Sequence, residues 1–212
     1  MKRIDTHGIF YIERVDGTAE WYWGSDYAEG DLYEAEELYS DKSTIKSNRL
    51  VLVHYPDGRV TEPVLADAGQ YLGRPLFCEG RLYLLMVDFL ERTINILRCD
   101  EHAEHTELET RLPLSAVKDC YNLMLMGAPL MLTRSGNGEK FQIIWPERMD
   151  IDVGENESFM CRQGNRLYFS KWLEDDEYYE AVVVRSYPEC ELIEMIHGAW
   201  QDMPDGQEWI VG

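Results

Sequence analysis

The chain is poor in positive charge. Its 212 residues carry 20 Lys and Arg against 40 Asp and Glu, which gives a formal net charge of −20. A DNA or RNA interface needs a basic stripe that displaces counterions from phosphates, and an anionic membrane attracts the same kind of stripe. We therefore expect neither a nucleic-acid partner nor a membrane. Basic proteins, cations and neutral ligands stay compatible with this acidity, and so does an acidity that serves solubility alone.

Long apolar runs and paired cysteines are also missing. No uninterrupted apolar stretch approaches the roughly 18 residues of a membrane span, and residues 1–7 hold no apolar core of a signal peptide. The five cysteines, at positions 78, 99, 120, 161 and 190, form no CxxC pair. An odd number of cysteines within strand-like runs is typical of reduced, buried thiols. These absences predict a cytoplasmic protein without disulfides.

The familiar catalytic motifs are absent as well. The chain has no GxSxG, P-loop, GxGxxG or HExxH sequence. The oxygen-rich run 150–157 lacks the spacing of an EF-hand loop. His102 and His105 flank a turn, where they do not share a helix face as a zinc pair would. We expect no metal and no cofactor, and binding is favoured over catalysis.

What the chain does have is a repeat. Short segments that begin at Tyr55, Cys99, Trp145 and Tyr187 are spaced by 44, 46 and 42 residues. Three of them read aromatic, proline, acid, and each follows an apolar run and precedes a strand-like run. A fixed period of this length indicates one supersecondary unit copied several times.

Between these markers the pattern is strand, turn, strand. Near copies such as Gly80-Arg81-Leu82-Tyr83 and Asn165-Arg166-Leu167-Tyr168 follow glycine turns, and Asn137-Gly138 is typical of a two-residue hairpin. The pattern predicts an all-β, propeller-like fold of about four four-stranded antiparallel blades in a single repeat domain, 1–212. The expected units are approximately 8–66, 67–115, 116–154 and 155–197.

Two segments stand outside the four units. An insertion at 24–47 follows the second strand of the first unit, and there Asp31 with Glu34 could cap a short helix, although an extended hairpin arm fits the apolar spacing equally well. The tail 198–212 is long enough for a strand that pairs with the first unit and closes the ring. The alternatives are a fifth blade built from the insertion and the tail, or two packed antiparallel sheets.

One end of the predicted blades collects acidic loops. In such a plan the connections between units and those between second and third strands lie at the same end, beneath the insertion. We predict binding residues there from two types, acids on the loops and tryptophans that could stack on a sugar or a peptide. Trp21 and Trp23 share one face of a strand, where a role in the core is the competing interpretation. The predicted binding residues are Trp23, Asp26, Asp67, Asp175, Asp176 and Trp200.

Three functional hypotheses follow. The first is a binding module whose acidic loop face takes a basic protein partner or a small neutral ligand such as a carbohydrate. The second is a hydrolase acting on a glycan, with paired carboxylates such as Asp26, Asp67 and Asp175 at the same end. The third is a structural subunit completed by a partner, which would expose an apolar patch at the first or last blade.

Overall fold

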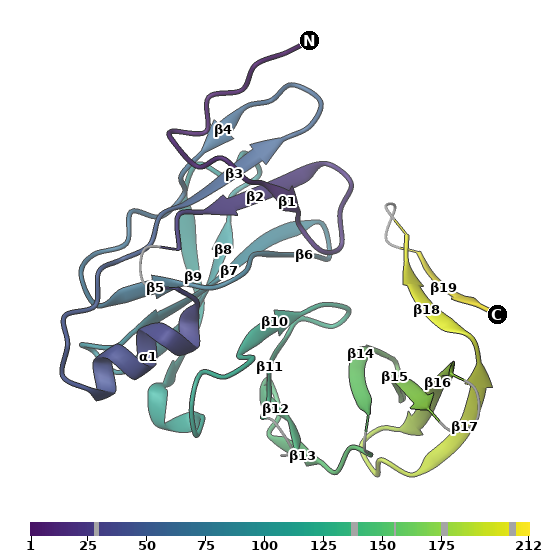
Figure 1. Ribbon diagram of the computed structural model, residues 1–212. Coiled ribbons are helices and arrows are strands. Elements are labelled where there is room, and N and C mark those ends of the chain that lie inside the picture. Colours follow the sequence, from purple (N-terminus) through teal and green to yellow (C-terminus); the bar gives the residue numbers. More distant parts are fainter. Residues whose placement is uncertain (28–29, 137–139, 155, 175–177, 204–206) are drawn as a thin grey trace.

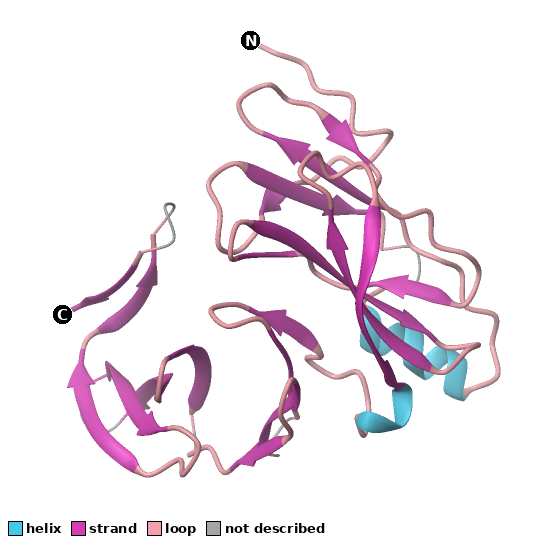
Figure 2. Ribbon diagram, turned by 180° about the vertical axis from the view of Figure 1, so that it is seen from behind, coloured by secondary structure: helices cyan, strands magenta, loops and turns pink. Residues whose placement is uncertain are grey.

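The computed structural model describes residues 1–212 apart from 28–29, 137–139, 155, 175–177 and 204–206. Five antiparallel sheets, here named A to E in chain order, account for nearly all of its regular structure (Figures 1 and 2). Sheet A contains β1 (Glu13–Arg14), β2 (Trp21–Ser25), β3 (Leu50–His54) and β4 (Val60–Thr61). Sheet B contains β5 (Gln70–Leu72), β6 (Leu76–Cys78), β7 (Arg81–Asp88), β8 (Thr93–Cys99) and β9 (Thr106–Pro113).

The remaining sheets continue the same plan. Sheet C contains β10 (Met124–Met126), β11 (Met131–Ser135), β12 (Phe141–Trp145) and β13 (Met149–Ile151). Sheet D contains β14 (Glu157–Gln163), β15 (Arg166–Glu174), β16 (Tyr178–Ser186) and β17 (Leu192–His197). Sheet E is a hairpin of β18 (Ala199–Asp202) and β19 (Glu208–Val211). The prediction of repeated four-stranded antiparallel sheets is confirmed.

Sheet B departs from the plan in its first strand. β5 pairs with one end of β7 and β6 with the other, so the two together take the place of a single strand. Pro75 lies between them and has no amide hydrogen to donate to a ladder. The interruption therefore leaves a four-strand path, β5-β7-β8-β9, with β6 beside β7.

The repeated sequence markers occupy the same place in each sheet, the turn between the third and fourth strands. In three of these turns a backbone amide donates to the carbonyl five residues further on: His54 to Arg59, Asp100 to His105, and Ser186 to Glu191. The marker thus records a recurring turn, and the turn fixes where each outer strand begins.

Successive sheets stack face to face, and their apolar residues meet between them. Trp21, Trp23 and Leu52 of sheet A pack with Leu84 and Leu97 of sheet B. A second cluster joins sheet B to sheet C, and a third joins sheet C to sheet D. Sheet E follows sheet D, where Trp200 lies 5.8 Å from Tyr168 between ring centroids. The stack runs along an arc, with sheet A at one end and sheet E at the other (Figure 1).

The C-terminal tail does not close this arc by strand pairing in the described residues. β18 pairs with β19, from Ala199 opposite Val211 to Asp202 opposite Glu208. The predicted pairing of the tail with the first unit is therefore not detected there, and a two-stranded sheet takes its place.

The insertion folds as a helix, one of the two conformations that its sequence allowed. α1 spans Leu32–Ser40 and begins with a capping box in which the Asp31 carboxylate accepts from the Glu34 amide and the Glu34 side chain accepts from the Asp31 amide. Leu32 and Ala35 are buried in the cluster that joins sheets B and C. In the part of the chain that is described, no helix has the length and apolar character needed to cross a membrane.

Candidate functional site

Several of the connections predicted to share one end lie side by side. The Asn48 side-chain amide donates to the Leu72 carbonyl at 2.8 Å, and the Leu72 amide donates back to Asn48 Oδ1 at 2.7 Å. Further along, the Leu114 amide donates to the Arg92 carbonyl at 2.8 Å. We call this end the rim. Among the described residues it comprises the connections 26–49, 62–69, 89–92, 114–123, 136–140 and 152–156.

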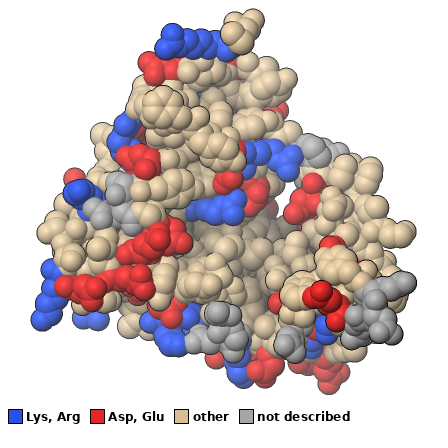
Figure 3. Space-filling view, in the orientation of Figure 1, with Lys and Arg blue, Asp and Glu red and all other residues tan. Residues whose placement is uncertain are grey.

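The first hollow of the rim lies against the helix. This α1 pocket has a volume of about 430 Å³, and its walls are Tyr33, Glu36, Glu37, Ser40, Asp41, Lys118 and Asp119. Acidic side chains gather over α1 on the face shown in Figure 3. Four carboxyl groups against one ammonium group make this hollow negative, so it suits a cationic side chain.

Glu36 is a partly buried acid of this pocket. Its Oε2 atom accepts the Cys120 amide at 2.6 Å, which ties the helix to the segment before sheet C. Burial raises the pKa of the Glu36 carboxyl, against the lowering effect of the Cys120 amide, and the nearby Asp119 carboxylate raises the pKa further. Glu36 is therefore more readily protonated than a solvated glutamate.

Asp119 is held in place by a different contact. Both of its carboxylate oxygens bind the guanidinium of Arg134, at 2.6 Å and 2.7 Å from Nη2. The Arg134 side chain is only 2% exposed, so the pair anchors the loop 118–122 to strand β11. A bidentate Arg–carboxylate pair fixes orientation as well as charge.

Two tyrosines stand beside these acids. The rings of Tyr33 on α1 and Tyr121 on the loop meet edge to face, with centroids 5.3 Å apart. The neighbouring Glu37 raises the pKa of the Tyr33 hydroxyl through its charge and a hydrogen bond. Aromatic faces attract guanidinium and ammonium groups, so these rings strengthen the preference of the pocket for cations.

The second hollow lies between sheets C and D. This C–D cleft has a volume of about 1210 Å³. Phe141 and Phe159 stack across the two sheets with ring centroids 4.3 Å apart, which gives the cleft an apolar wall. Hydrogen-bonding side chains form much of the remaining lining, namely Tyr121, Asn122, Thr133, Ser135, Lys140, Gln142, Asp152 and Ser158.

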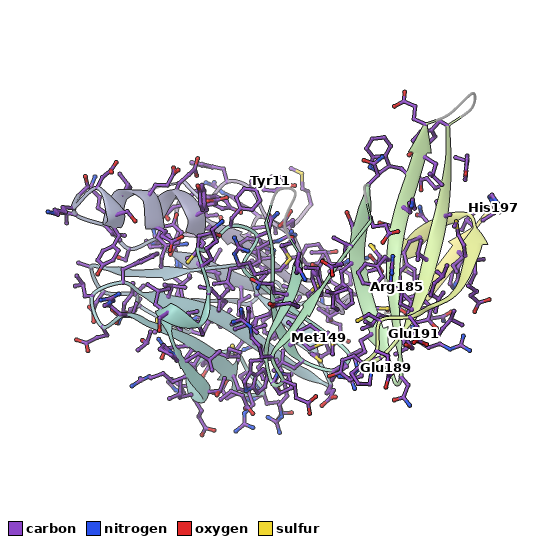
Figure 4. All side chains as sticks on the ribbon, turned by 90° about the horizontal axis from the view of Figure 1, so that it is seen from below. Tyr11, Met149, Arg185, Glu189, Glu191 and His197 are labelled. Atoms are coloured by element: carbon purple, nitrogen blue, oxygen red, sulfur yellow. The ribbon has the colours of Figure 1, made fainter. Side chains whose placement is uncertain are left out.

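A buried ion cluster supports the cleft from sheet D. Glu157, whose side chain is 4% exposed, accepts from Arg185 at 2.9 Å and from Lys171 at 3.4 Å. Burial by itself raises the pKa of Glu157, but the Gly154 amide, Arg185 and Lys171 outweigh it and hold the pKa below its usual range. Arg185 on sheet D and Met149 on sheet C lie toward the junction of the two sheets in Figure 4.

The two hollows are joined by one stretch of chain. Lys118 and Asp119 line the α1 pocket, whereas Tyr121 and Asn122, two and three residues beyond Asp119, line the C–D cleft. We call the combined surface the rim groove. Its helical end is acidic and aromatic. Its other end combines an apolar wall with hydrogen-bonding groups, both neutral and charged, and an extended polar chain with a basic side chain can fill such an arrangement.

The predicted binding residues are dispersed with respect to this groove. Trp23 is 3% exposed and packs in the core between sheets A and B, as its competing interpretation held. Asp26 and Asp67 are exposed rim residues outside both hollows, and Asp26 accepts the Arg49 amide at 2.9 Å. Trp200 packs on Tyr168 and donates to Asp202 at 2.8 Å. Asp175 and Asp176 lie outside the described residues.

Sequence reasoning did not single out the residues that build the groove. Tyr33, Glu36 and Glu37 lie on one side of α1, the helix whose start the capping box at Asp31 and Glu34 indicated. That signal could have found them once the helix was preferred over the hairpin arm. Phe141 and Phe159 carried no comparable signal, because alternating aromatic residues in strands are typical of a core.

Metal and thiol chemistry find little support in the described residues. No group of three or more His, Cys, Asp or Glu side chains among them is arranged to hold a metal ion. Asp150 accepts from Gln142, and Asp152 pairs with Lys140, so these acids of the oxygen-rich run already have partners. All five cysteines are free, and burial raises the pKa of the Cys99 thiol to about 12.

No protein-family model and no curated protein sequence matches this chain.

Proposed function

We propose that this protein is a binding module whose rim groove takes a basic segment of a protein partner. The observation that carries the proposal is that one short segment, 118–122, lines both hollows: Lys118 and Asp119 line the α1 pocket, and Tyr121 and Asn122 line the C–D cleft. An extended peptide could place an Arg or Lys side chain among the acids of α1 and lay its neighbouring residues toward the stacked phenylalanines of the cleft. Charge selects the partner, and the aromatic contacts add affinity.

The groove is also preorganised, which reduces the entropy lost on binding. The capping box fixes the start of α1, Glu36 holds the helix to Cys120, and Arg134 holds Asp119. These contacts keep the walls of the α1 pocket in place before a partner arrives. Electrostatic steering by a chain of net charge −20 would in addition speed the encounter with a basic surface.

The stack of sheets supports a propeller-like interpretation of the architecture. Each sheet is a meander of consecutive strands, apart from the pairing of β5 with β7 in sheet B, and the connections between sheets A, B, C and D gather at the rim. In propeller folds, loop ends of this kind commonly hold ligands, which is support by analogy. The same proposal includes a ring that closes between sheets E and A. In the third hypothesis, a partner protein is seated between these two sheets. Exposed Phe10 and Tyr11 near sheet A, and Trp209 on sheet E, fit that hypothesis.

A second candidate function, hydrolysis of a glycan, rests on one observation. The α1 pocket contains a carboxyl with a raised pKa, Glu36, and a second carboxyl group, Asp119, that is paired with Arg134. A general acid and a second carboxylate are the two groups that glycoside hydrolysis requires. Assays of reducing-sugar release from a panel of oligosaccharides test it, and this candidate is lost if Glu36→Gln leaves any activity found unchanged.

The binding proposal is tested with a labelled hexa-arginine peptide in fluorescence anisotropy. The variant Glu36→Gln/Glu37→Gln/Asp41→Asn neutralises three acids of the α1 pocket. We expect it to weaken binding at least about tenfold, which corresponds to about 1.4 kcal/mol. The matched control, Asp26→Asn/Asp67→Asn/Glu91→Gln, removes the same charge from rim residues outside the pocket and should weaken binding about threefold or less, because its effect is screened by salt.

Two outcomes decide the question. Equal losses in the two triple variants would show that the peptide senses overall charge, and the groove would then have no special role. A selective loss would be followed by capture of partners from host extract with the wild-type chain and the pocket variant. A carbohydrate ligand would instead appear as a thermal shift with neutral oligosaccharides that the charge changes leave intact.

A further inference from the structure

The C–D cleft has an apolar wall that suits an aromatic ring. Phe141 and Phe159 stack there with ring centroids 4.3 Å apart, and Met124 and Met126 also line the cleft. Thioether side chains are flexible and polarisable, and they make favourable contacts with aromatic rings. A flat ring that enters the cleft therefore meets aromatic and thioether side chains that can adjust to its shape.

The same cleft carries hydroxyl groups that are available to a ligand. Tyr121, Ser135 and Ser158 line it, and within the described part of the chain none of their three side-chain hydroxyls has a hydrogen-bond partner. The Gln142 amide, by contrast, already donates to Asp150 at 2.8 Å. A hydroxyl both donates and accepts hydrogen bonds. These three groups can thus hold a polar group that arrives together with the ring.

The charged side chains that line the cleft already have partners of opposite sign. Lys140 lies 3.0 Å from Asp152, and Glu157 is bound by Arg185 at 2.9 Å. A further charge buried there would need a partner of its own. The cleft therefore favours a neutral group, in contrast to the α1 pocket, where four carboxyl groups face one ammonium group.

Side chains from the two hollows touch each other. Tyr33 lines the α1 pocket and Tyr121 lines the C–D cleft, and their rings meet edge to face with centroids 5.3 Å apart. A second link runs through Arg134, which donates to Asp119 of the α1 pocket at 2.7 Å and to Gln142 of the cleft at 3.4 Å. A ligand that crosses the tyrosine pair therefore reaches both hollows.

We propose that the C–D cleft takes a tyrosine or tryptophan side chain from the same partner segment that places its basic residue in the α1 pocket, an inference that rests on the proposed function. Both side chains combine an apolar ring with a polar tip, and the tip needs a hydrogen-bond partner when it is buried. The ring packs on Phe141 and Phe159, and the tip bonds to the hydroxyls of the cleft. Phenylalanine or leucine would leave those hydroxyls without a partner.

The geometry also limits the spacing between the two residues of the partner. The hollows lie on either side of a tyrosine pair whose centroids are 5.3 Å apart. An extended chain rises about 3.3 Å per residue, so a separation of about two to four residues spans about 7–13 Å and crosses the pair. The partner is thus a short extended motif in which Arg or Lys and Tyr or Trp are separated by this distance.

Fluorescence anisotropy with labelled peptides tests the proposal. Each peptide carries a pair of arginines, a serine spacer of variable length and a final Trp, Tyr, Phe or Ala. At the best spacing, we expect Trp and Tyr to bind at least about tenfold more tightly than Ala, and Phe to gain about threefold or less over Ala. Equal affinities for the four residues, or an affinity that does not depend on the spacer, would overturn the proposal.

A hydroxyl-deletion variant assigns the ring to the cleft. Tyr121→Phe/Ser158→Ala removes two hydroxyls and keeps the apolar wall, so it should weaken the Trp peptide about fivefold and leave the Ala peptide unchanged. The matched control, Tyr55→Phe/Ser115→Ala, removes the same groups from exposed residues outside both hollows and should bind every peptide as the wild type does. Equal losses in the two variants would place the tryptophan elsewhere and contradict the assignment.

The α1 variant Glu36→Gln/Glu37→Gln/Asp41→Asn distinguishes failure of this motif from failure of the binding function. If that variant weakens every peptide, while Trp adds nothing over Ala in the wild type, the α1 pocket binds the basic residue and the aromatic assignment alone is wrong. If it binds every peptide as the wild type does, the basic residue does not occupy the α1 pocket, and the two-point motif is wrong together with the proposed function.

Discussion

The interface between sheets A and B and the interface between sheets C and D are built differently. The first is filled by large side chains, with Trp21, Trp23 and Leu52 all 6% exposed or less. The second has an apolar cluster too, but beside it lies a cleft of about 1210 Å³, supported by the buried carboxylate of Glu157. Both interfaces join neighbouring four-stranded sheets of the same kind.

This difference in packing shows that the same repeated unit, an antiparallel sheet, can form either a filled interface or an open one. Where the facing side chains are large and apolar, the sheets meet and the interface contributes stability through burial. Where the facing side chains include Lys140, Gln142 and Ser158, the sheets leave room, and hydrogen-bonding groups line the space between them. The proposed binding function therefore depends on what fills the space between sheets, and less on the sheets themselves.

The largest expected effect on stability comes from truncating one aromatic residue in each interface and comparing the two losses. Trp23→Ala should lower the free energy of unfolding by about 3–5 kcal/mol, because it leaves a large cavity in a filled core. Phe159→Ala should cost less, since Phe159 is half-buried and one side of its ring faces the cleft. Urea unfolding of both variants measures this, and similar losses would mean that the C–D interface is as tightly filled as the A–B interface.

A smaller effect on stability is expected from the ion cluster of Glu157, Arg185 and Lys171 at the C–D cleft. Glu157→Gln should lower stability by about 2–3 kcal/mol at neutral pH, because Arg185 and Lys171 lose their shared partner, although both are partly exposed to water. The pKa of Glu157 is depressed in the folded state. Its contribution is thus present above the unfolded-state pKa and is lost as pH falls through the folded-state pKa.

Unfolding followed from pH 7 to about pH 3 checks this prediction. The stability of wild type should converge on that of Glu157→Gln at the acid end of the range. A difference between the two proteins that stays constant with pH would indicate that the variant loses packing, and the carboxylate would then not be the source of the stability.

The smallest expected effect on stability concerns Glu36 in the α1 pocket. Its pH dependence has the opposite sign to that of Glu157. The pKa of Glu36 is raised in the folded state, so folding binds a proton there, and the contribution of this group to stability falls as pH rises through the raised pKa. Glu36→Gln should remove that decline while leaving stability at acid pH nearly unchanged. Thermal unfolding across pH 4–8, a range of about four units around the usual carboxyl pKa, measures it. A steeper decline in the variant would contradict the assignment.

The sequence could predict the sheets because their signals are local. The turns that begin at Tyr55, Cys99, Trp145 and Tyr187 recur because each closes the third strand of its unit, and the Asp31–Glu34 capping box is likewise contained in a few residues. The groove could not be predicted in this way. Its walls depend on contacts such as Glu36 with Cys120, which are 84 residues apart, and such contacts leave no mark in the spacing of either segment.

The nearly regular meander within each sheet bears on how the molecule assembles. In the described sheets, hydrogen-bonded strands are neighbours in the chain except where β5 pairs with β7, and the long excursion is the helical insertion between β2 and β3. Early pairing then involves mostly short loops, whose closure entropy is low, and the costly step is the docking of one finished layer on the next. Cooperativity should accordingly spread from layer to layer, as it does in linear arrays of modules.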